Sequence, residues 1–280
     1  MNYVLITGVS TGIGYTISEL LIQKNYHVFG SVRTKSDAKL LTKKFGMANF
    51  TPLIFDVTNI VEIQKSVEFV KRTIGNNHLI GLINNAGIAT FGPIMHIPVS
   101  KIYQQFEVNV IGLLNVSRAF FPLLISPQHE NSSQVGRIIN ISSVSSHISL
   151  PFIGLYAASK HAVRSISNSL RLEILSYGIK VVLIEPGIVK TPIWKKDIDI
   201  SSYQNTNYFK KLEYCLGKFD ELKKFSVPIS LVAQTIFFAL IEPIPKTHYI
   251  LPGNQIIWCI LKNLPNKWLD VLLAWYFKLK

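Results

Sequence analysis

A glycine-rich turn near the N-terminus limits the folds open to this chain. The apolar run Tyr3–Thr7 stops at Gly8, Gly12 and Gly14, and an amphipathic helical pattern follows at once. In a strand–turn–helix context, glycines let the backbone approach a pyrophosphate, which then meets the free N–H groups of the helix N-terminus. The turn therefore predicts the first βα unit of a nucleotide-binding sheet. A tight turn without a ligand is the alternative interpretation.

Apolar runs and helical patterns continue to alternate along the chain. The run at 79–83 is nearly all apolar, as expected for a strand that is covered on both faces. Repeated βα units with short connections predict a doubly wound, Rossmann-type parallel sheet of about seven strands with helices on both faces. The predicted strands are 3–7, 27–32, 51–55, 79–83, 137–142, 180–185 and 247–251, and the predicted helices include 60–74, 100–124, 156–177 and 228–241.

The end of the second predicted strand bears on the choice between NAD and NADP. An NAD site places an acidic side chain about 20 residues past the glycines, where it binds the ribose 2′-hydroxyl. Here Arg33 lies 19 positions after Gly14 (33 − 14 = 19), Lys35 is close by, and the nearest acid, Asp37, comes later. Because a guanidinium suits a 2′-phosphate, the sequence favours NADP(H) over NAD(H). The alternative is that Arg33 is a solvated loop cation.

A polar stretch at 140–160 holds the candidate catalytic residues. Tyr156 and Lys160 are four positions apart on a predicted helix, so their side chains share one face. A lysine ammonium beside the phenol is expected to lower a tyrosine pKa that is ordinarily near ~10. Ser143 follows the strand 137–142, and its hydroxyl is expected to meet the same substrate oxygen. Together the three residues predict a proton-transfer site for a carbonyl/alcohol couple.

Charge and cysteine content restrict the partners. The formal net charge is +13, but the lysines are spread along the chain without a long block of like charges. We therefore expect no nucleic-acid partner, and a phosphate-bearing cofactor or an anionic membrane surface instead. Cys215 and Cys259 have no metal-binding spacing, and no metal site is expected. A strand that begins almost at residue 1 leaves no room for a signal peptide, so we expect a cytoplasmic protein.

The chain length suits one large domain, predicted over residues 1–252. Within it, residues 188–226 are rich in aromatic residues and lysines, and they predict a mobile lid over the substrate. Residues 253–280 form a Trp- and Leu-rich tail that is too interrupted by lysines and Pro265 for a membrane span. The tail predicts two short amphipathic helices. They either pack on the substrate entrance or a partner subunit, or lie on a membrane surface through residues 255–280.

Taken in order, these motifs resemble the short-chain dehydrogenase/reductase family, in its single-domain branch, over about residues 3–192. Thr7–Gly14 resembles the family's cofactor turn, Asp56 its acid at the adenine ring, and Asn84–Gly87 the motif that steadies the sheet. Pro186-Gly187 and Thr191 resemble the loop that meets the nicotinamide carboxamide. The resemblance implies that the cofactor is bound by Gly8, Ser10, Thr11, Gly12, Ile13, Gly14, Arg33, Asp56, Val57, Asn85, Ala86, Gly87, Tyr156, Lys160, Pro186, Gly187, Val189 and Thr191.

The resemblance also implies the catalytic roles. Hydride passes between the nicotinamide and a substrate carbon, while Tyr156 delivers or removes the proton of the oxygen. Ser143 hydrogen-bonds that oxygen, and Lys160 lowers the Tyr156 pKa and binds the nicotinamide ribose. Asn109 is expected to link Lys160 to solvent through a water molecule.

Within the family, the chain is similar to the group around 17β-hydroxysteroid and retinol dehydrogenases, through Val32–Thr34, Thr191–Trp194 and the hydrophobic tail. A mostly apolar pocket wall predicts a lipophilic alcohol or carbonyl substrate. Steroids, retinoids, fatty aldehydes and polyketide-like ketones all remain open. His147 is expected to line the pocket or lie on the surface, not to act as a second base. The predicted substrate contacts are Ser143, His147, Phe152, Trp194 and Met95.

Two other functions and one assembly complete the expectations. A non-catalytic cofactor sensor could use the same fold, but it would have no use for a complete set of catalytic residues. An epimerase or dehydratase would ordinarily be longer. A homodimer is expected through the helix 156–177, whose apolar face is Ala157, Val163, Ile166, Leu170 and Ile174.

Overall fold

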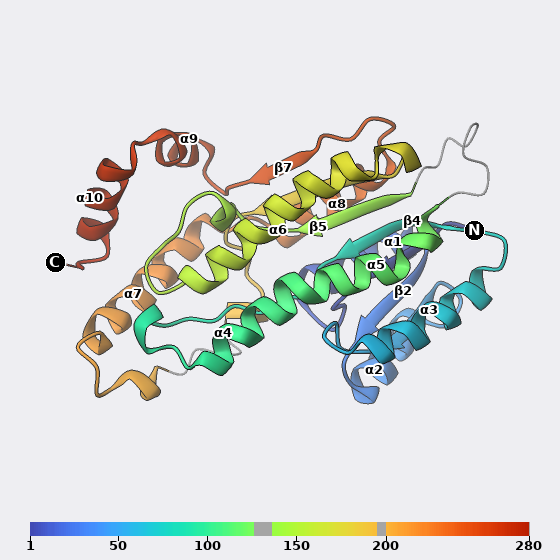
Figure 1. The fold of residues 1–280 in the computed structure, drawn as a ribbon, viewed down its shortest axis with the longest axis horizontal. Coiled ribbons are helices and arrows are strands. Elements are labelled where there is room, and N and C mark those ends of the chain that lie inside the picture. The colour runs from blue at the N-terminus through green and yellow to red at the C-terminus, as the bar shows by residue number, and fades with distance from the viewer. Residues whose placement is uncertain (126–135, 195–199, 280) are drawn as a thin grey trace.

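The computed structural model describes residues 1–125, 136–194 and 200–279. Its centre is one parallel sheet of seven strands, in the order β3-β2-β1-β4-β5-β6-β7 (Figure 1). This confirms the predicted doubly wound α/β fold, in which the direction of winding reverses between β1 and β4. The strands are β1 (Tyr3–Ile6), β2 (His27–Val32), β3 (Phe50–Ile54), β4 (Leu79–Asn84), β5 (Arg137–Ile141), β6 (Lys180–Pro186) and β7 (His248–Leu251).

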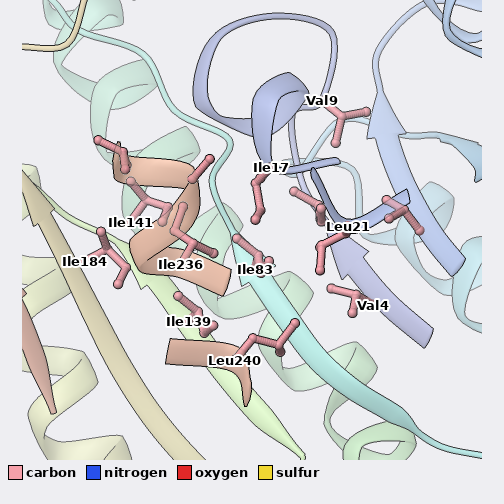
Figure 2. Close-up of a cluster of buried hydrophobic side chains, with 14 of the residues drawn as sticks. Val4, Val9, Ile17, Leu21, Ile83, Ile139, Ile141, Ile184, Ile236 and Leu240 are labelled. Atoms are coloured by element: carbon pink, nitrogen blue, oxygen red, sulfur yellow. The ribbon is translucent and has the colours of Figure 1, made fainter. Parts of the chain in front are cut away.

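Helices pack on both faces of the sheet, and each face has its own apolar core. Figure 2 shows the first core, where Leu21 and Leu240 of two neighbouring helices lie over strand residues such as Ile83. The first layer consists of α1 (Gly12–Gln23), α2 (Lys35–Phe45) and α8 (Ile229–Ile241), and the second of α3 (Ile60–Ile74), α5 (Gly112–Leu124) and α6 (Gly154–Glu173).

Strand composition and helix caps explain this arrangement. Strands β2, β4 and β5 are buried along their whole length, because their mostly apolar side chains are covered from both sides. The Thr34 side chain caps α2 by accepting a hydrogen bond from the Asp37 backbone N–H, and Asn59 caps α3 in the same way. These short strand-to-helix connections place the carboxyl ends of β2 and β3 at the edge where such sheets bind ligands.

The predicted helix 100–124 is interrupted. It consists of α4 (Val99–Phe106), a π-helical turn at Glu107–Ile111 and then α5, which together run as one rod (Figure 1). A π turn inserts one extra residue and is frequently found at functional sites; this one contains Asn109. By length and composition, Val99–Leu124 could cross a membrane, but 44% of its most apolar window is buried and it packs on β4 and α6.

The apolar face predicted for dimerisation on α6 packs largely within the chain. Ala157 and Val163 have no exposed surface, and Ile174 is 7% exposed. The exposed large apolar side chains on this stretch include Leu172 and Leu175 instead. Ala157, Val163 and Ile174 are therefore core residues of this chain, because they face its own sheet and the neighbouring helix.

Beyond β6 the chain builds a third apolar cluster. Within the predicted lid, α7 (Phe209–Leu222) buries Leu212 beside Phe91 and Ile153, while residues 195–199 lie outside the described residues. After β7 come α9 (Gln255–Asn263) and α10 (Asn266–Tyr276), which lie with α7 at the end of the sheet to which the strand arrows point (Figure 1). Phe277 is 1% exposed and packs on Phe219 of α7, which fastens the tail to that helix.

Candidate active site

The glycine turn after β1 is shaped by close backbone approach. Gly8 and Gly12 adopt φ angles of 71° and 65°, a region that disfavours side chains. A Cβ on Gly8 would lie 3.0 Å from Ala86 Cα, and one on Gly14 would overlap the Gly8 carbonyl oxygen. The Asn85 amide secures the turn by donating to the carbonyl oxygens of Thr7 and Gly8, at 2.9 and 3.0 Å. The resulting backbone cradle at the start of α1 fits a pyrophosphate.

Charged and capped residues form the rim beyond the turn. Arg33 is exposed directly after β2, whereas the Asp37 carboxylate accepts a hydrogen bond from the Thr34 hydroxyl at 2.8 Å. After β3, Asp56 Oδ1 accepts from both the backbone N–H and the hydroxyl of Thr58. Asp37 is thus engaged in the cap of α2, and Arg33 presents a cation at this end of the site.

These segments line one cavity of about 780 Å³ along the carboxyl ends of the strands. It runs from the Arg33 rim past the glycine turn to the proposed catalytic residues. All the predicted cofactor residues line it except Gly14, whose place is in the packing beneath the turn. The lining includes Gly8, Ser10, Thr11, Gly12, Ile13, Arg33, Asp56, Val57, Asn85, Ala86, Gly87, Tyr156, Lys160, Pro186, Gly187, Val189 and Thr191.

Ser143, Tyr156 and Lys160 meet in this cavity and are each 6% exposed. Ser143 follows β5, and its side chain shares a hydrogen bond with that of Tyr156 on the first turn of α6. The Lys160 ammonium lies 5.7 Å from the centre of the Tyr156 ring and donates to the Ile141 carbonyl oxygen at 2.8 Å. The strand end and the helix start therefore bring a hydroxyl, a phenol and an ammonium to one place.

Burial has the largest effect on the pKa values of Tyr156 and Lys160. It raises the pKa of Tyr156 to about 12, although the hydrogen bond with Ser143 acts in the opposite direction. Burial also lowers the pKa of Lys160 to about 8. Loss of hydration outweighs the hydrogen bond and sets the net direction of the Tyr156 shift, and the expected lowering of this pKa by Lys160 stays a prediction. At neutral pH the phenol is consequently protonated, as a proton donor must be.

Asn109 supports the loop beside the site. Its amide oxygen accepts from the Ile88 N–H at 2.9 Å, and its amide nitrogen donates to the Ile88 carbonyl and the Ser159 hydroxyl, each at 3.0 Å. Through these bonds it ties the loop after β4 to α6. Within the described residues, Asn109 and Lys160 make no direct hydrogen bond to each other, so the predicted link through water stays a prediction.

The predicted substrate contacts separate into different environments. Among them, Ser143 alone lines the cavity within the described residues. Met95 is 83% exposed, and Phe152 packs on Phe91 and Tyr208 under α7. The His147 side chain is only 5% exposed, and its Nε2 atom lies 3.0 Å from Glu185 Oε1. Trp194 ends the turn Pro192–Trp194, and its side chain lies outside the described residues.

Sequence reasoning missed two kinds of residue. Ser31 accepts a hydrogen bond from the Gly8 N–H at 3.0 Å, although it looked like an ordinary strand residue. Glu185 is completely buried at the end of β6 and receives hydrogen bonds from several side chains. An acid inside the apolar run 180–185 was the available signal, since such a residue requires partners when buried.

Known proteins place this arrangement in a family. The model of the short chain dehydrogenase family matches residues 2–200. The NADPH-dependent 3-dehydrocapnine reductase of Ornithobacterium rhinotracheale is 36% identical, over 96% of this chain and 95% of its own length. The type 6 17-beta-hydroxysteroid dehydrogenase of Rattus norvegicus is 32% identical, over 98% of this chain and 88% of its own length.

A solved structure supports the fold independently. A short-chain dehydrogenase from Streptomyces avermitilis superimposes with a TM-score of 0.75 and 23% identity, covering 98% of this chain and 93% of that chain. The glycine turn, the continuous cavity and the grouped Ser143, Tyr156 and Lys160 all lie within the stretch that the family model matches. The chain therefore belongs to the short-chain dehydrogenase family of NAD(P)-dependent oxidoreductases.

Proposed function

We propose that this protein uses NADPH to reduce a ketone or aldehyde on a lipophilic substrate. The observation that carries the proposal is the meeting of Ser143, Tyr156 and Lys160 in a cavity that extends without interruption to the glycine turn. NADPH, when bound there, supplies the hydride for the carbonyl carbon. The remaining chemistry is the delivery of one proton to the carbonyl oxygen, which this chain's side chains can perform.

Tyr156 is the proposed proton donor. A pKa of about 12 keeps the phenol protonated at neutral pH, yet leaves it more acidic than the product alcohol, so it can protonate the alkoxide that would form as hydride arrives. The Ser143 hydroxyl, already paired with Tyr156, donates a hydrogen bond to the same oxygen and stabilises its developing charge. The Lys160 ammonium, 5.7 Å from the Tyr156 ring, stabilises the phenolate that remains after transfer.

Arg33 is the basis for proposing NADP(H) in preference to NAD(H). It is exposed at the cavity rim, while the nearest acid serves the cap of α2. A guanidinium that binds a 2′-phosphate contributes roughly 1.5–3 kcal/mol, about 10- to 100-fold in affinity. The 36%-identical reductase is itself described as NADPH-dependent, which supports the same choice.

The cofactor test is a fluorescence titration of NADPH and NADH on three proteins. Arg33→Ala should weaken NADPH binding about 10- to 100-fold and leave NADH binding nearly unchanged. Lys39→Ala removes an exposed cation from α2, the helix that begins just after Arg33, so it is the matched control and should change neither affinity. Equal affinity of the wild type for the two cofactors would refute the role of Arg33.

The substrate is proposed from relatives and from the apolar surroundings of the site. We would assay 3-dehydrocapnine first, because a 36%-identical relative is named for its reduction, then steroid ketones and retinaldehyde. Tyr156→Phe should lower kcat by about 10²–10⁴-fold. Tyr177→Phe removes a hydroxyl from the far end of the same helical stretch and serves as the control. Tight NADPH binding without turnover of any of these substrates would favour a cofactor sensor instead.

Contact with a membrane surface is proposed for the tail. The exposed apolar side chains of α9 and α10 include Ile256, Ile260, Trp268 and Trp275, at 74%, 57%, 67% and 76% exposure. Lysines flank them, and basic helices with exposed tryptophans suit an anionic bilayer surface. Binding to anionic vesicles in a flotation assay, lost in Trp268→Ser/Trp275→Ser, tests this role. A second copy of this chain is the other predicted partner, and light scattering without vesicles would reveal it.

A further inference from the structure

A buried carboxylate connects the two segments that enclose the proposed reaction site. Glu185 is the penultimate residue of β6 and has no exposed surface. Directly after it come Pro186 and Gly187, which line the cavity opposite Ser143. The Ser143 hydroxyl lies 3.4 Å from the Pro186 carbonyl oxygen, so the two segments touch at the catalytic serine. Any force that fixes one segment relative to the other therefore acts on the position of that serine.

One oxygen of Glu185 reaches the loop that carries Ser143. The Ser146 hydroxyl lies 2.8 Å from Glu185 Oε1 and 2.6 Å from the Ser143 carbonyl oxygen, so it bridges the carboxylate and the serine backbone. His147 Nε2 lies 3.0 Å from the same carboxylate oxygen. The Trp258 ring of α9 packs against the edge of the His147 ring, with ring centres 5.2 Å apart, and this closes the loop from the tail side.

The other oxygen reaches the neighbouring strand. His248 Nδ1 of β7 lies 2.9 Å from Glu185 Oε2, and its Nε2 lies 3.0 Å from the amide oxygen of Asn168 on α6. Arg164 Nε, also on α6, is 3.6 Å from Glu185 Oε1. The charged and titratable groups around the carboxylate are thus His147, His248 and Arg164 among the described residues, and all are cationic or can become so.

We propose that Glu185 is a positioning residue for the reaction: through Ser146 and His147 it holds the Ser143 loop against the Pro186–Gly187 turn. The hydrogen bonds define the mechanism. An ionised carboxylate accepts from both the serine hydroxyl and the imidazole, which fixes two consecutive residues of the loop. Ser143 lies three positions before Ser146, and its carbonyl oxygen also accepts from the Ser146 hydroxyl. Glu185 therefore restrains the position of the proposed catalytic Ser143 hydroxyl as well.

The charge of Glu185 suits this role. Burial alone would raise its pKa, but hydrogen bonds from His147, His248 and Ser146 outweigh burial and bring the pKa down to about 2. The carboxylate is therefore ionised throughout the range in which an enzyme works.

The test separates catalysis from cofactor binding in Glu185→Gln. A misplaced catalytic group typically costs up to about 100-fold in rate, so kcat should fall about 10- to 100-fold, with the dissociation constant of NADPH unchanged within about twofold.

Two further variants keep the outcome decisive if Glu185→Gln folds poorly. Ser146→Ala removes the bridge to Ser143 and should reproduce the loss in kcat, again with the dissociation constant of NADPH unchanged. Asn168→Ala removes only the outer partner of His248, so it should lower the melting temperature without lowering kcat at 25 °C. Wild-type kcat in both Glu185→Gln and Ser146→Ala would overturn the proposal, as would equal losses in Ser146→Ala and Asn168→Ala.

The positioning role rests on the proposed carbonyl reduction, and the two can fail separately. An inactive wild type that binds NADPH would contradict the proposed function. An active wild type whose kcat is matched by Glu185→Gln would contradict only the role of Glu185.

Discussion

The two ends of the cavity are built in different ways. At the cofactor end, a glycine turn, two capped helix starts and Arg33 lie within consecutive βα units of the chain. At the substrate end, Glu185 of β6 is held by residues from the loop after β5, from β7 and from α6. Local backbone conformation shapes the first end, while side chains distant in the sequence shape the second. Substitutions should therefore affect the two ends in distinct ways.

We expect the largest change in unfolding free energy where Phe277 attaches the C-terminal tail to α7. Phe277→Ala removes a ring that is 1% exposed and packs on Phe219, and truncating a buried Phe costs about 3–5 kcal/mol. We expect faster hydrogen exchange in α7 and α10 and a raised KM for substrate, with NADPH affinity unchanged. Trp275→Ala, at a position 76% exposed, should change the unfolding free energy by less than about 0.5 kcal/mol. Equal exchange in the two variants would show that the tail is not fastened to α7.

The next largest effect is expected from Glu185 and its hydrogen-bond partners, as a loss of unfolding free energy in acid. The folded-state pKa of Glu185, about 2, lies below the ~4.3 of a free glutamate, so its stabilisation is present above pH ~4.3 and lost as the pH falls towards 2. Hydrogen bonds to a charged group contribute roughly 1.5–3 kcal/mol. Denaturant unfolding between pH 7 and pH 2.5 should show a steeper loss for the wild type than for Glu185→Gln. Parallel curves would contradict a low pKa for this carboxylate.

The glycine turn should respond through cofactor binding. A Cβ on Gly14 would overlap the Gly8 carbonyl oxygen and lie 2.5 Å from Asn85 Nδ2. Overpacking of this kind costs about 1–3 kcal/mol. Gly14→Ala should lower the unfolding free energy by that amount and weaken NADPH binding in calorimetry. Unchanged affinity would show that the packing beneath the turn does not shape the pyrophosphate site.

Substitution of a second glycine should change the unfolding free energy least, and should increase it. Gly217 lies inside α7, and a Cβ there would meet no atom within 4 Å. Gly217→Ala should therefore stabilise α7 by up to about 1 kcal/mol, because alanine has the higher helix propensity. A calorimetric melting temperature at or above that of the wild type is expected. A lower one would mean that α7 needs the flexibility of glycine.

This contrast explains which features could be predicted from the sequence. The sheet followed from the glycine spacing and the apolar runs, because each is a pattern within a short stretch. The cofactor contacts stay a prediction, although all of the expected residues except Gly14 line one cavity. The π turn at Asn109 was missed, because it has no simple periodic signal. His147 was expected at the pocket or surface, yet it pairs with Glu185, 38 positions away in the chain.

The environment of Tyr156 also lay beyond the sequence. Four-residue spacing correctly places Tyr156 and Lys160 on one face of α6, but it carries no information about burial. In the structure, burial raises the pKa of the phenol to about 12 and the ammonium donates to the Ile141 carbonyl oxygen. Motif spacing therefore indicated the participants, whereas the pKa of the phenol depends on three-dimensional packing.

Isotope transfer tests the central claim most directly. The protein would be incubated with NADPH that carries deuterium at both C4 positions and with 3-dehydrocapnine, steroid ketones or retinaldehyde, and the alcohol products analysed by mass spectrometry and NMR. Carbonyl reduction with Tyr156 as proton donor predicts one deuterium on the carbinol carbon of at least one product, formed by the wild type and by Tyr177→Phe but hardly by Tyr156→Phe. NADPH that binds tightly yet transfers no deuterium to any of these carbonyls, or full transfer by Tyr156→Phe, would contradict the account.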